Sequence, residues 1–175
     1  MKRIKNYFNR LFKKLLLQLK DLQGTPYSIA AGFACGVAIS FTPFIGFHLI
    51  LAAISAWIIR GNVVSSALGT IIGNPWTFPF IWIAVLSTGR FLLGDTATTD
   101  QVNFIKIFGS ASKALFTLNF GNFGRDVWPI LFPMMIGCIP YYIVSWFVSF
   151  KIIKIMLDKI AQRRARRKLL QGENK

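Results

Sequence analysis

Two turns that contain proline decide how this chain can fold: residues 42–47 read TPFIGF, and residues 74–79 read NPWTFP. Each turn lies in the middle of a long apolar run. Proline lacks a backbone N–H and its ring clashes with the preceding helical turn, so we expect each run to break there. Irregular backbone survives inside a bilayer only where it is buried in protein or faces water.

The segment around these turns is almost free of charge. No acidic residue occurs between Asp21 and Asp95, and Arg60 and Arg90 are the only Lys or Arg residues between them. Such a segment is difficult to keep in water and easy to place in a bilayer. Together with an apolar share of 54% and a mean hydropathy of +0.51, it predicts an all-α integral membrane protein.

The first apolar block runs from Tyr27 to Ile59. One crossing of a ~30 Å hydrocarbon core takes about 20 helical residues, so this block is too long for one straight crossing and too short for two. A break at Pro43 predicts two short helices, near residues 28–41 and 47–59. The first broken unit therefore spans residues 27–60.

The second broken unit, residues 63–90, repeats this plan. A short apolar helix meets the break at Pro75, and a second apolar segment ends at Arg90. Pro43 and Pro75 are each followed by an aromatic residue, and Arg60 closes the first unit as Arg90 closes the second. Paired apolar segments with such interruptions are typical of binding sites at the interface between two repeats.

Small residues in both units predict close helix packing. Gly32 and Gly36 lie four positions apart, as do Gly69 and Gly73. This small-xxx-small spacing lets helix backbones approach closely in lipid. We expect it to serve packing within the chain rather than dimerisation.

The rest of the chain predicts helices of three kinds. Residues 1–23 form a basic amphipathic helix, which lies at the membrane interface or docks on the protein's own membrane domain. The membrane domain, residues 24–150, also includes an amphipathic segment at 100–120 and a membrane helix at 127–150. Pro129, Pro133 and Pro140 are expected to kink that helix. Residues 151–175 continue it as a basic cytoplasmic tail.

The formal net charge of +15 is concentrated at the two ends. Basic ends around an apolar middle indicate anionic lipid at a cytoplasmic membrane face. Nucleic acid is the alternative partner of so basic a chain, but no nucleic-acid-binding signature accompanies the charge, so none is predicted. The protein partner stays open. The residues expected at the membrane surface are Lys2, Arg3, Lys5, Arg10, Lys13, Lys14, Arg163, Arg164, Arg166, Arg167 and Lys168.

Residues that could carry enzyme chemistry are scarce. His48 is the only histidine, the apolar core has no carboxylate, and no Gly-x-Ser-x-Gly motif occurs. We therefore predict no enzyme activity, no metal and no cofactor. The remaining polar groups near the breaks are rich in hydrogen-bond donors, and the arginine fork suits a phosphate. The candidate ligand-binding residues are Thr42, Pro43, His48, Arg60, Asn74, Pro75, Thr77 and Arg90.

Structural roles for the same residues stay open. Asn74 and Thr77 flank Pro75 and can satisfy the backbone that the proline frees. Arg60 and Arg90 end apolar segments, so both can extend to lipid headgroups without binding a specific ligand. His48 follows the first break and can serve a structural hydrogen bond or a proton relay.

Several of these motifs together resemble the bacterial membrane family catalogued as domain of unknown function 2062. The resemblance covers roughly residues 20–150, and its most specific part is the asparagine-proline-x-threonine-x-proline element. It implies a bacterial membrane protein and implies no activity. In that family the domain occurs alone or beside glycosyltransferase domains, for which this chain is too short. The residues that carry the resemblance are TPYSIA at 25–30, Gly32, Phe33, Gly36, TPFIGFH at 42–48, Gly69 and GNPWTFP at 73–79.

These observations lead to two functional hypotheses. The first is a small bacterial inner-membrane protein that binds or translocates an anionic lipid or lipid-linked phosphate at one site made by the two proline turns. The alternative is a membrane scaffold or assembly factor that transports nothing, in which the core only packs.

Both chain ends are predicted to lie in the cytoplasm, because seven basic residues occur in the first twenty positions and nine occur from Lys151 onward. The number of full crossings is then even, and the first broken block is expected to be a re-entrant hairpin. Reporter fusions at each end should be active in the cytoplasm. A reporter that is active only in the periplasm would contradict this topology.

Overall fold

The structure is a computed structural model that describes residues 14–15, 17–44, 46–73, 77–94 and 128–172, without the side chains of 164–165 and 167–172. All regular structure in these ranges is helical. Residues 14–15 and 17–21 are also helical. The remaining elements are α2 (Pro26–Ile39), α3 (His48–Ile58), α4 (Val63–Gly69), η1 (Thr70–Ile72), α5 (Phe78–Leu92) and α8 (Trp128–Gly172).

Helix α2 begins and ends where its sequence directs. The Thr25 side chain accepts a hydrogen bond from the Ser28 N–H and so caps the first turn, where Pro26 costs no hydrogen bond. The helix ends at Ile39, and α3 begins at His48 after the turn that contains Pro43. The two short helices expected around the first proline break are therefore present, within a few residues of the expected limits.

Helix α3 ends in a Schellman motif. The Gly61 N–H donates to the Ala56 carbonyl at 2.7 Å, and the Arg60 N–H donates to the Trp57 carbonyl at 3.1 Å. Arg60 itself takes the left-handed conformation, with φ 57°, in the position that glycine usually occupies. A non-glycine residue there carries strain of about 1 kcal/mol.

Asn62 begins α4 and joins it to the start of α2. Its side-chain oxygen accepts from the Ser65 N–H at 2.8 Å, its amide group donates to the Gln23 carbonyl at 2.9 Å, and its backbone N–H donates to the Ser28 carbonyl at 2.8 Å. The Ser65 hydroxyl adds a bond of 2.6 Å to the Ile29 carbonyl. These bonds hold the first turns of α2 and α4 side by side.

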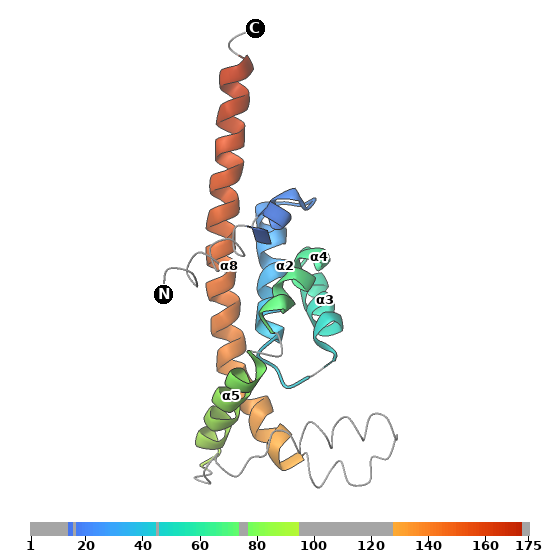
Figure 1. Ribbon diagram of the computed structural model, residues 1–175, viewed down its shortest axis with the longest axis vertical. Helices are drawn as coiled ribbons and strands as arrows, with labels where there is room; N and C mark the ends of the chain where they lie inside the picture. The colour runs from blue at the N-terminus through green and yellow to red at the C-terminus, as the bar shows by residue number, and fades with distance from the viewer. Residues whose placement is uncertain (1–13, 16, 45, 74–76, 95–127, 173–175) are drawn as a thin grey trace.

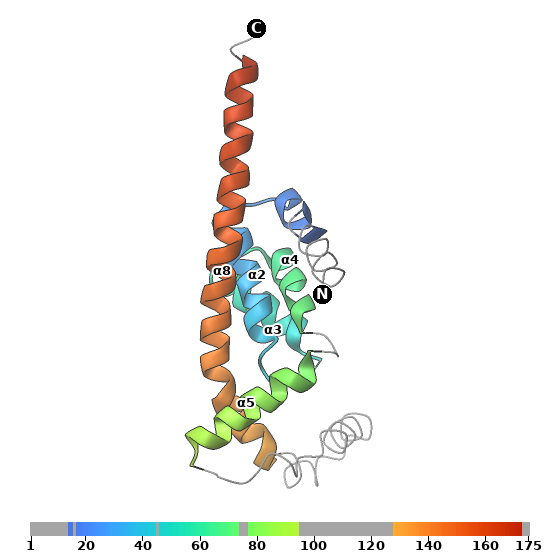
Figure 2. The same cartoon turned by 60° about the vertical axis from the view of Figure 1, so that its left-hand side comes forward.

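Helix α8 is the element on which the others pack. It runs for 45 residues and passes through Pro133 and Pro140 without interruption. Its first turns lean away from the straight remainder, as expected for a proline-containing helix (Figure 1). α2 lies along its middle and α5 crosses its lower part, while the C-terminal turns extend beyond the other helices (Figures 1 and 2). Among the described helices, only α8 is long and apolar enough to span a membrane, within residues Trp128–Arg163.

Two separate apolar clusters form along α8. One joins α2 to the later turns of α8 and includes the helical segment before α2, through Leu19, Phe33, Val37, Ile153 and Leu157. The other joins α5 to the earlier turns, through Val85, Leu86, Met134 and Cys138. The fold therefore has two packing centres at different levels of one long helix.

Glycines make the close helix contacts. A Cβ atom at Gly36 would fall on the Ser66 carbonyl oxygen, one at Gly69 would fall on the Phe33 carbonyl oxygen, and one at Gly32 would fall on the Asn62 carbonyl oxygen. The predicted packing role within the chain is confirmed for these glycines.

The α5–α8 crossing uses a second glycine pair, which the sequence analysis did not single out. A Cβ at Gly89 would fall on the Pro133 carbonyl oxygen, and one at Gly137 would fall on the Val85 carbonyl oxygen. The α2–α4 contact and the α5–α8 contact thus both depend on backbones that touch.

Gly69→Ala should destabilise the fold, because the added methyl group meets backbone that cannot move aside as a side chain can. Overpacking a tight contact costs roughly 1–3 kcal/mol, and this site should lie at the upper end. Ala67→Val adds volume to an exposed position of the same helix and should have little effect. Thermal unfolding in a mild detergent compares the two variants. Equal stability would show that α2 and α4 do not pack this closely.

Candidate functional site

The two proline-containing breaks come together at the lower end of α2. The His48 ring, just after the first break, stacks on the Phe78 ring, just after the second, with centroids 5.4 Å apart. Just before the breaks, a Cβ at Gly73 would lie 2.7 Å from the Ser40 Cβ. The segments that precede the two breaks thus contact each other, and so do the segments that follow them. Asn74 and Pro75 themselves lie outside the described residues.

The register of α2 and α4 explains this meeting. The two helices run in the same direction, with Ser28 beside Asn62 at their starts and Gly36 beside Gly69 further along. The offset between partners stays near the 32 positions that separate Pro43 from Pro75. Both breaks therefore arrive at the same level of the fold.

Hydroxyl groups at the breaks bond to nearby backbone carbonyls. The Thr42 hydroxyl donates to the Ile39 carbonyl at 2.7 Å, and the Ser40 hydroxyl donates to the Gly36 carbonyl at 3.0 Å. After the second break, the Thr77 hydroxyl donates to the Ile72 carbonyl at 2.7 Å. The Gly36 and Ile39 carbonyls also accept backbone N–H groups, from Ser40 and Thr42, so the two hydroxyls are second donors to these carbonyls. The hydroxyl bonds favour the structural interpretation of Thr42 and Thr77 over ligand contact.

His48 is the candidate at this junction with the most direct link between the breaks. Its Nε2 lies 3.3 Å from the Thr42 carbonyl oxygen, and its ring is half-buried against Phe78. Phe78 in turn packs against Trp82, with ring centroids 5.6 Å apart. Pro43 is buried beside them. The junction is thus mainly aromatic, with one imidazole among apolar rings.

The two arginines do not join this junction, so the prediction of one site containing Arg60 and Arg90 is wrong. Arg60 follows α3 beside the start of α2, where Gly61 meets Gly32. Arg90 lies near the end of α5, where its neighbour Gly89 meets Pro133. Phe150, which meets Tyr27 at the start of α2, and Pro133 are 17 residues apart on α8, or about 25 Å at 1.5 Å per helical residue. The cause is that α3 runs back toward the start of α2, whereas α5 continues away from it (Figures 1 and 2).

The described basic residues of the expected membrane surface are exposed. Lys14 lies in the helical segment before α2, and Arg163 and Arg166 lie on the late turns of α8. Lys2, Arg3, Lys5, Arg10 and Lys13 lie outside the described residues. Arg164, Arg167 and Lys168 belong to α8, and their side chains are outside the described set.

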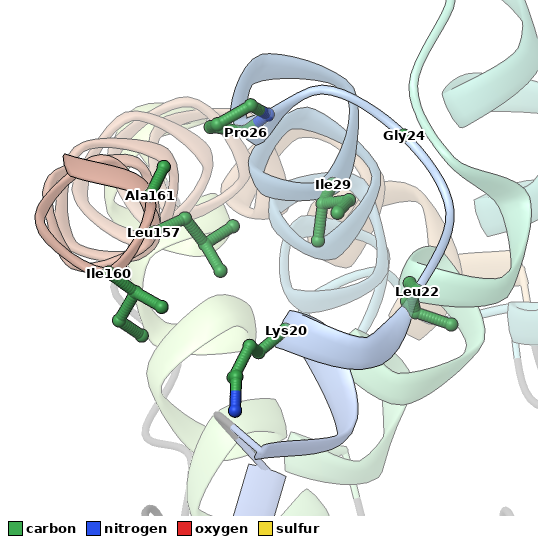
Figure 3. A pocket seen from close by; sticks show the side chains of 8 residues that line it. All are labelled: Lys20, Leu22, Gly24, Pro26, Ile29, Leu157, Ile160 and Ala161. Carbon is green, nitrogen blue, oxygen red and sulfur yellow. The ribbon is translucent and has the colours of Figure 1, made fainter. Parts of the chain in front are cut away.

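A cavity of about 200 Å³ lies between the segment before α2, the start of α2 and the late turns of α8. Figure 3 shows Ile29 and Leu157 facing each other across it, while the Lys20 amine points away from both. The side chains that line it are mostly aliphatic, and no set of polar side chains converges on it, so it is not assigned as a binding site.

A second cavity, of about 240 Å³, was missed by sequence reasoning. Its lining includes Cys35 of α2, Ser55 of α3, and Tyr142 and Trp146 of α8. No local pattern could have revealed it, because its walls come from segments far apart in the chain. In the described part of the molecule, no three His, Cys, Asp or Glu side chains gather where they could hold a metal ion.

Phe78→Ala should loosen the junction, because it removes the ring on which His48 stacks. An aromatic pair contributes about 0.5–1.5 kcal/mol beyond its buried area, so the total loss should exceed about 1 kcal/mol. Phe80→Ala in the same helix is the control, since that ring is 77% exposed. Thermal unfolding of both variants tests the contact, and equal melting temperatures would argue against it.

Comparison with known proteins places the chain in a family but supplies no function. No curated protein and no solved structure matches it. A family model described as an uncharacterized protein conserved in bacteria matches residues 9–166, which is most of the chain. The chain belongs to this bacterial family, DUF2062.

Proposed function

We propose that this protein resides in the bacterial inner membrane, where it binds or translocates an anionic lipid or lipid-linked phosphate. The observation that carries the proposal is the amount of apolar surface that the fold leaves uncovered. Trp57 is 75% exposed, Phe80 77% and Phe91 82%, and they lie on α3 and α5. Large exposed apolar patches mark contact with a membrane or a partner. On α8 the exposed apolar side chains are Trp128, Phe132, Met135, Ile139, Ile143, Val144, Phe147, Val148, Ile152 and Ile155.

Helix lengths support a re-entrant arrangement of α2 and α3 beside α8. α2 has 14 residues and α3 has 11, so each reaches at most about 21 Å, which is less than the ~30 Å hydrocarbon core. The turn between them brings the chain back toward the side from which it came. Irregular backbone at such depth needs partners within the protein, and at the second break the Thr77 hydroxyl provides one for the Ile72 carbonyl.

Charge supports an anionic lipid as the partner. The chain has 21 Lys and Arg residues against 6 Asp and Glu residues, and basic residues next to an apolar segment attract anionic headgroups. Arg60 is exposed at the end of α3, close to the apolar surface of that helix. A guanidinium group there suits a phosphate.

The scaffold alternative draws support from the junction of the two breaks. The hydroxyls of Ser40, Thr42 and Thr77 already donate to backbone carbonyls. A transport path needs polar groups that become available to the cargo. In the scaffold function, the basic ends hold lipid or a partner and the core stays fixed.

Translocation of labelled phosphatidylglycerol in reconstituted vesicles tests the proposal. Vesicles with the full-length protein should bring the label to the opposite leaflet faster than protein-free vesicles, and a zwitterionic lipid should move less. Retention of anionic lipid without translocation would favour the scaffold function. Neither binding nor translocation of an anionic lipid would refute the proposal.

A further inference from the structure

The cavity that Cys35, Ser55 and Tyr142 line opens between α3 and α8. We propose that it is a lateral groove that holds one acyl chain of an anionic diacyl phospholipid, whose phosphate binds Arg60. This inference rests on the proposed lipid-binding function and assigns it a position. That position is separate from the junction of the two proline-containing breaks.

The groove has the small size and the mainly apolar wall that an acyl chain requires. At about 240 Å³ it is smaller than the roughly 300–1,000 Å³ of a pocket for a drug-sized molecule. Most of its wall is apolar, and the polar groups that line it include the hydroxyls of Ser55 and Tyr142 and the thiol of Cys35. A ligand in the groove therefore meets mainly apolar wall.

The groove continues into the surface assigned to lipid. Ile143 is 49% exposed and Phe147 is 54% exposed, so these two wall residues belong to both the groove and the outer face of α8. On the facing wall, Trp57 and Ile58 of α3 are exposed beside Ile59. An acyl chain can thus enter sideways from the bilayer without crossing a polar rim. This continuity argues for a lipid over a water-soluble ligand.

Two cations mark one end of the groove. Ile59 lines it, and Arg60 is the next residue of the chain. On α8, residues four apart share a face, so Lys151 continues the stripe of Ile143 and Phe147 beyond the groove. Contacts between α2 and its neighbours place both cations at similar levels. Asn62, which lies two residues after Arg60, bonds to Ser28 in the first turn of α2. Phe150, which precedes Lys151, has its ring 5.6 Å from the ring of Tyr27 in the same turn.

Arg60 is held in an unfavourable backbone conformation, which a glycine would occupy without strain. Among the described residues, no carboxylate forms an ion pair with it. Strained residues often occur at functional sites, so the strain at Arg60 indicates a functional role for this residue. A phosphate at the end of the groove accounts for an arginine in this position.

The test measures lipid binding to the full-length protein in a neutral detergent by native mass spectrometry. The probes are phosphatidylglycerol, phosphatidylcholine and a polyprenyl phosphate. Wild-type protein should retain one phosphatidylglycerol in preference to phosphatidylcholine. Ile143→Trp fills the groove and should weaken phosphatidylglycerol binding about tenfold or more. Ile152→Trp is the matched control on the same helix, with similar exposure outside the groove, and should leave binding unchanged.

Arg60→Gly tests the headgroup contact without disturbing the turn, because glycine accepts the left-handed conformation. It should reduce phosphatidylglycerol binding by about tenfold, the scale of a lost charge-assisted hydrogen bond, and melting temperature should not fall.

The outcomes separate this inference from the proposed function. Anionic lipid that binds wild type and all three variants equally would overturn the groove and leave the proposed function standing. Preference for polyprenyl phosphate over phosphatidylglycerol would overturn the diacyl assignment. A wild-type protein that binds none of the anionic probes would overturn both.

Discussion

Backbone contact between α2 and α4 is the interaction on which the rest of the structure depends. Where Gly36 meets Gly69, no side chain separates the helices, so their relative position is fixed by main-chain atoms. The two helices run in parallel, and the offset between contacting residues stays nearly constant. The break that follows α2 therefore lies beside the break that follows α4. The residues that flank the two breaks are thus gathered into one place, where hydroxyls and aromatic rings lie together. Without this register, each break would need its own enclosure.

The sequence was a good guide to local structure for physical reasons. Proline terminates helices by removing a donor, so the break around Pro43 and the short helices beside it follow from composition alone. Glycines four positions apart in the sequence predict the close α2–α4 contact. The capping roles of Thr25 and Asn62 also agree with residue preferences at helix starts.

The relation between segments could not be predicted in the same way. Arg60 and Arg90 occupy equivalent places in the two units, and this equivalence suggested a shared site. The direction of the second helix in each unit decides otherwise: α3 turns back along α2, whereas α5 continues onward to meet α8 through Gly89 and Gly137. The second helices of the two similar units, α3 and α5, therefore pack in different environments. The groove beside Tyr142 depends on the same long-range placement, and its walls have no common sequence signal.

The length of α8 has a consequence for its distal charges. From Lys151, where the apolar run ends, to Arg166 the helix rises by roughly 22 Å at 1.5 Å per residue. Electrostatic screening at physiological ionic strength has a characteristic length of about 8 Å. If α8 stands upright in the proposed membrane, Arg163 and Arg166 are more than two screening lengths from the headgroups and feel little of their field. Either the helix leans strongly enough to lay these arginines on the bilayer, or its tip acts as a spacer that presents positive charge to an anionic molecule away from the membrane surface.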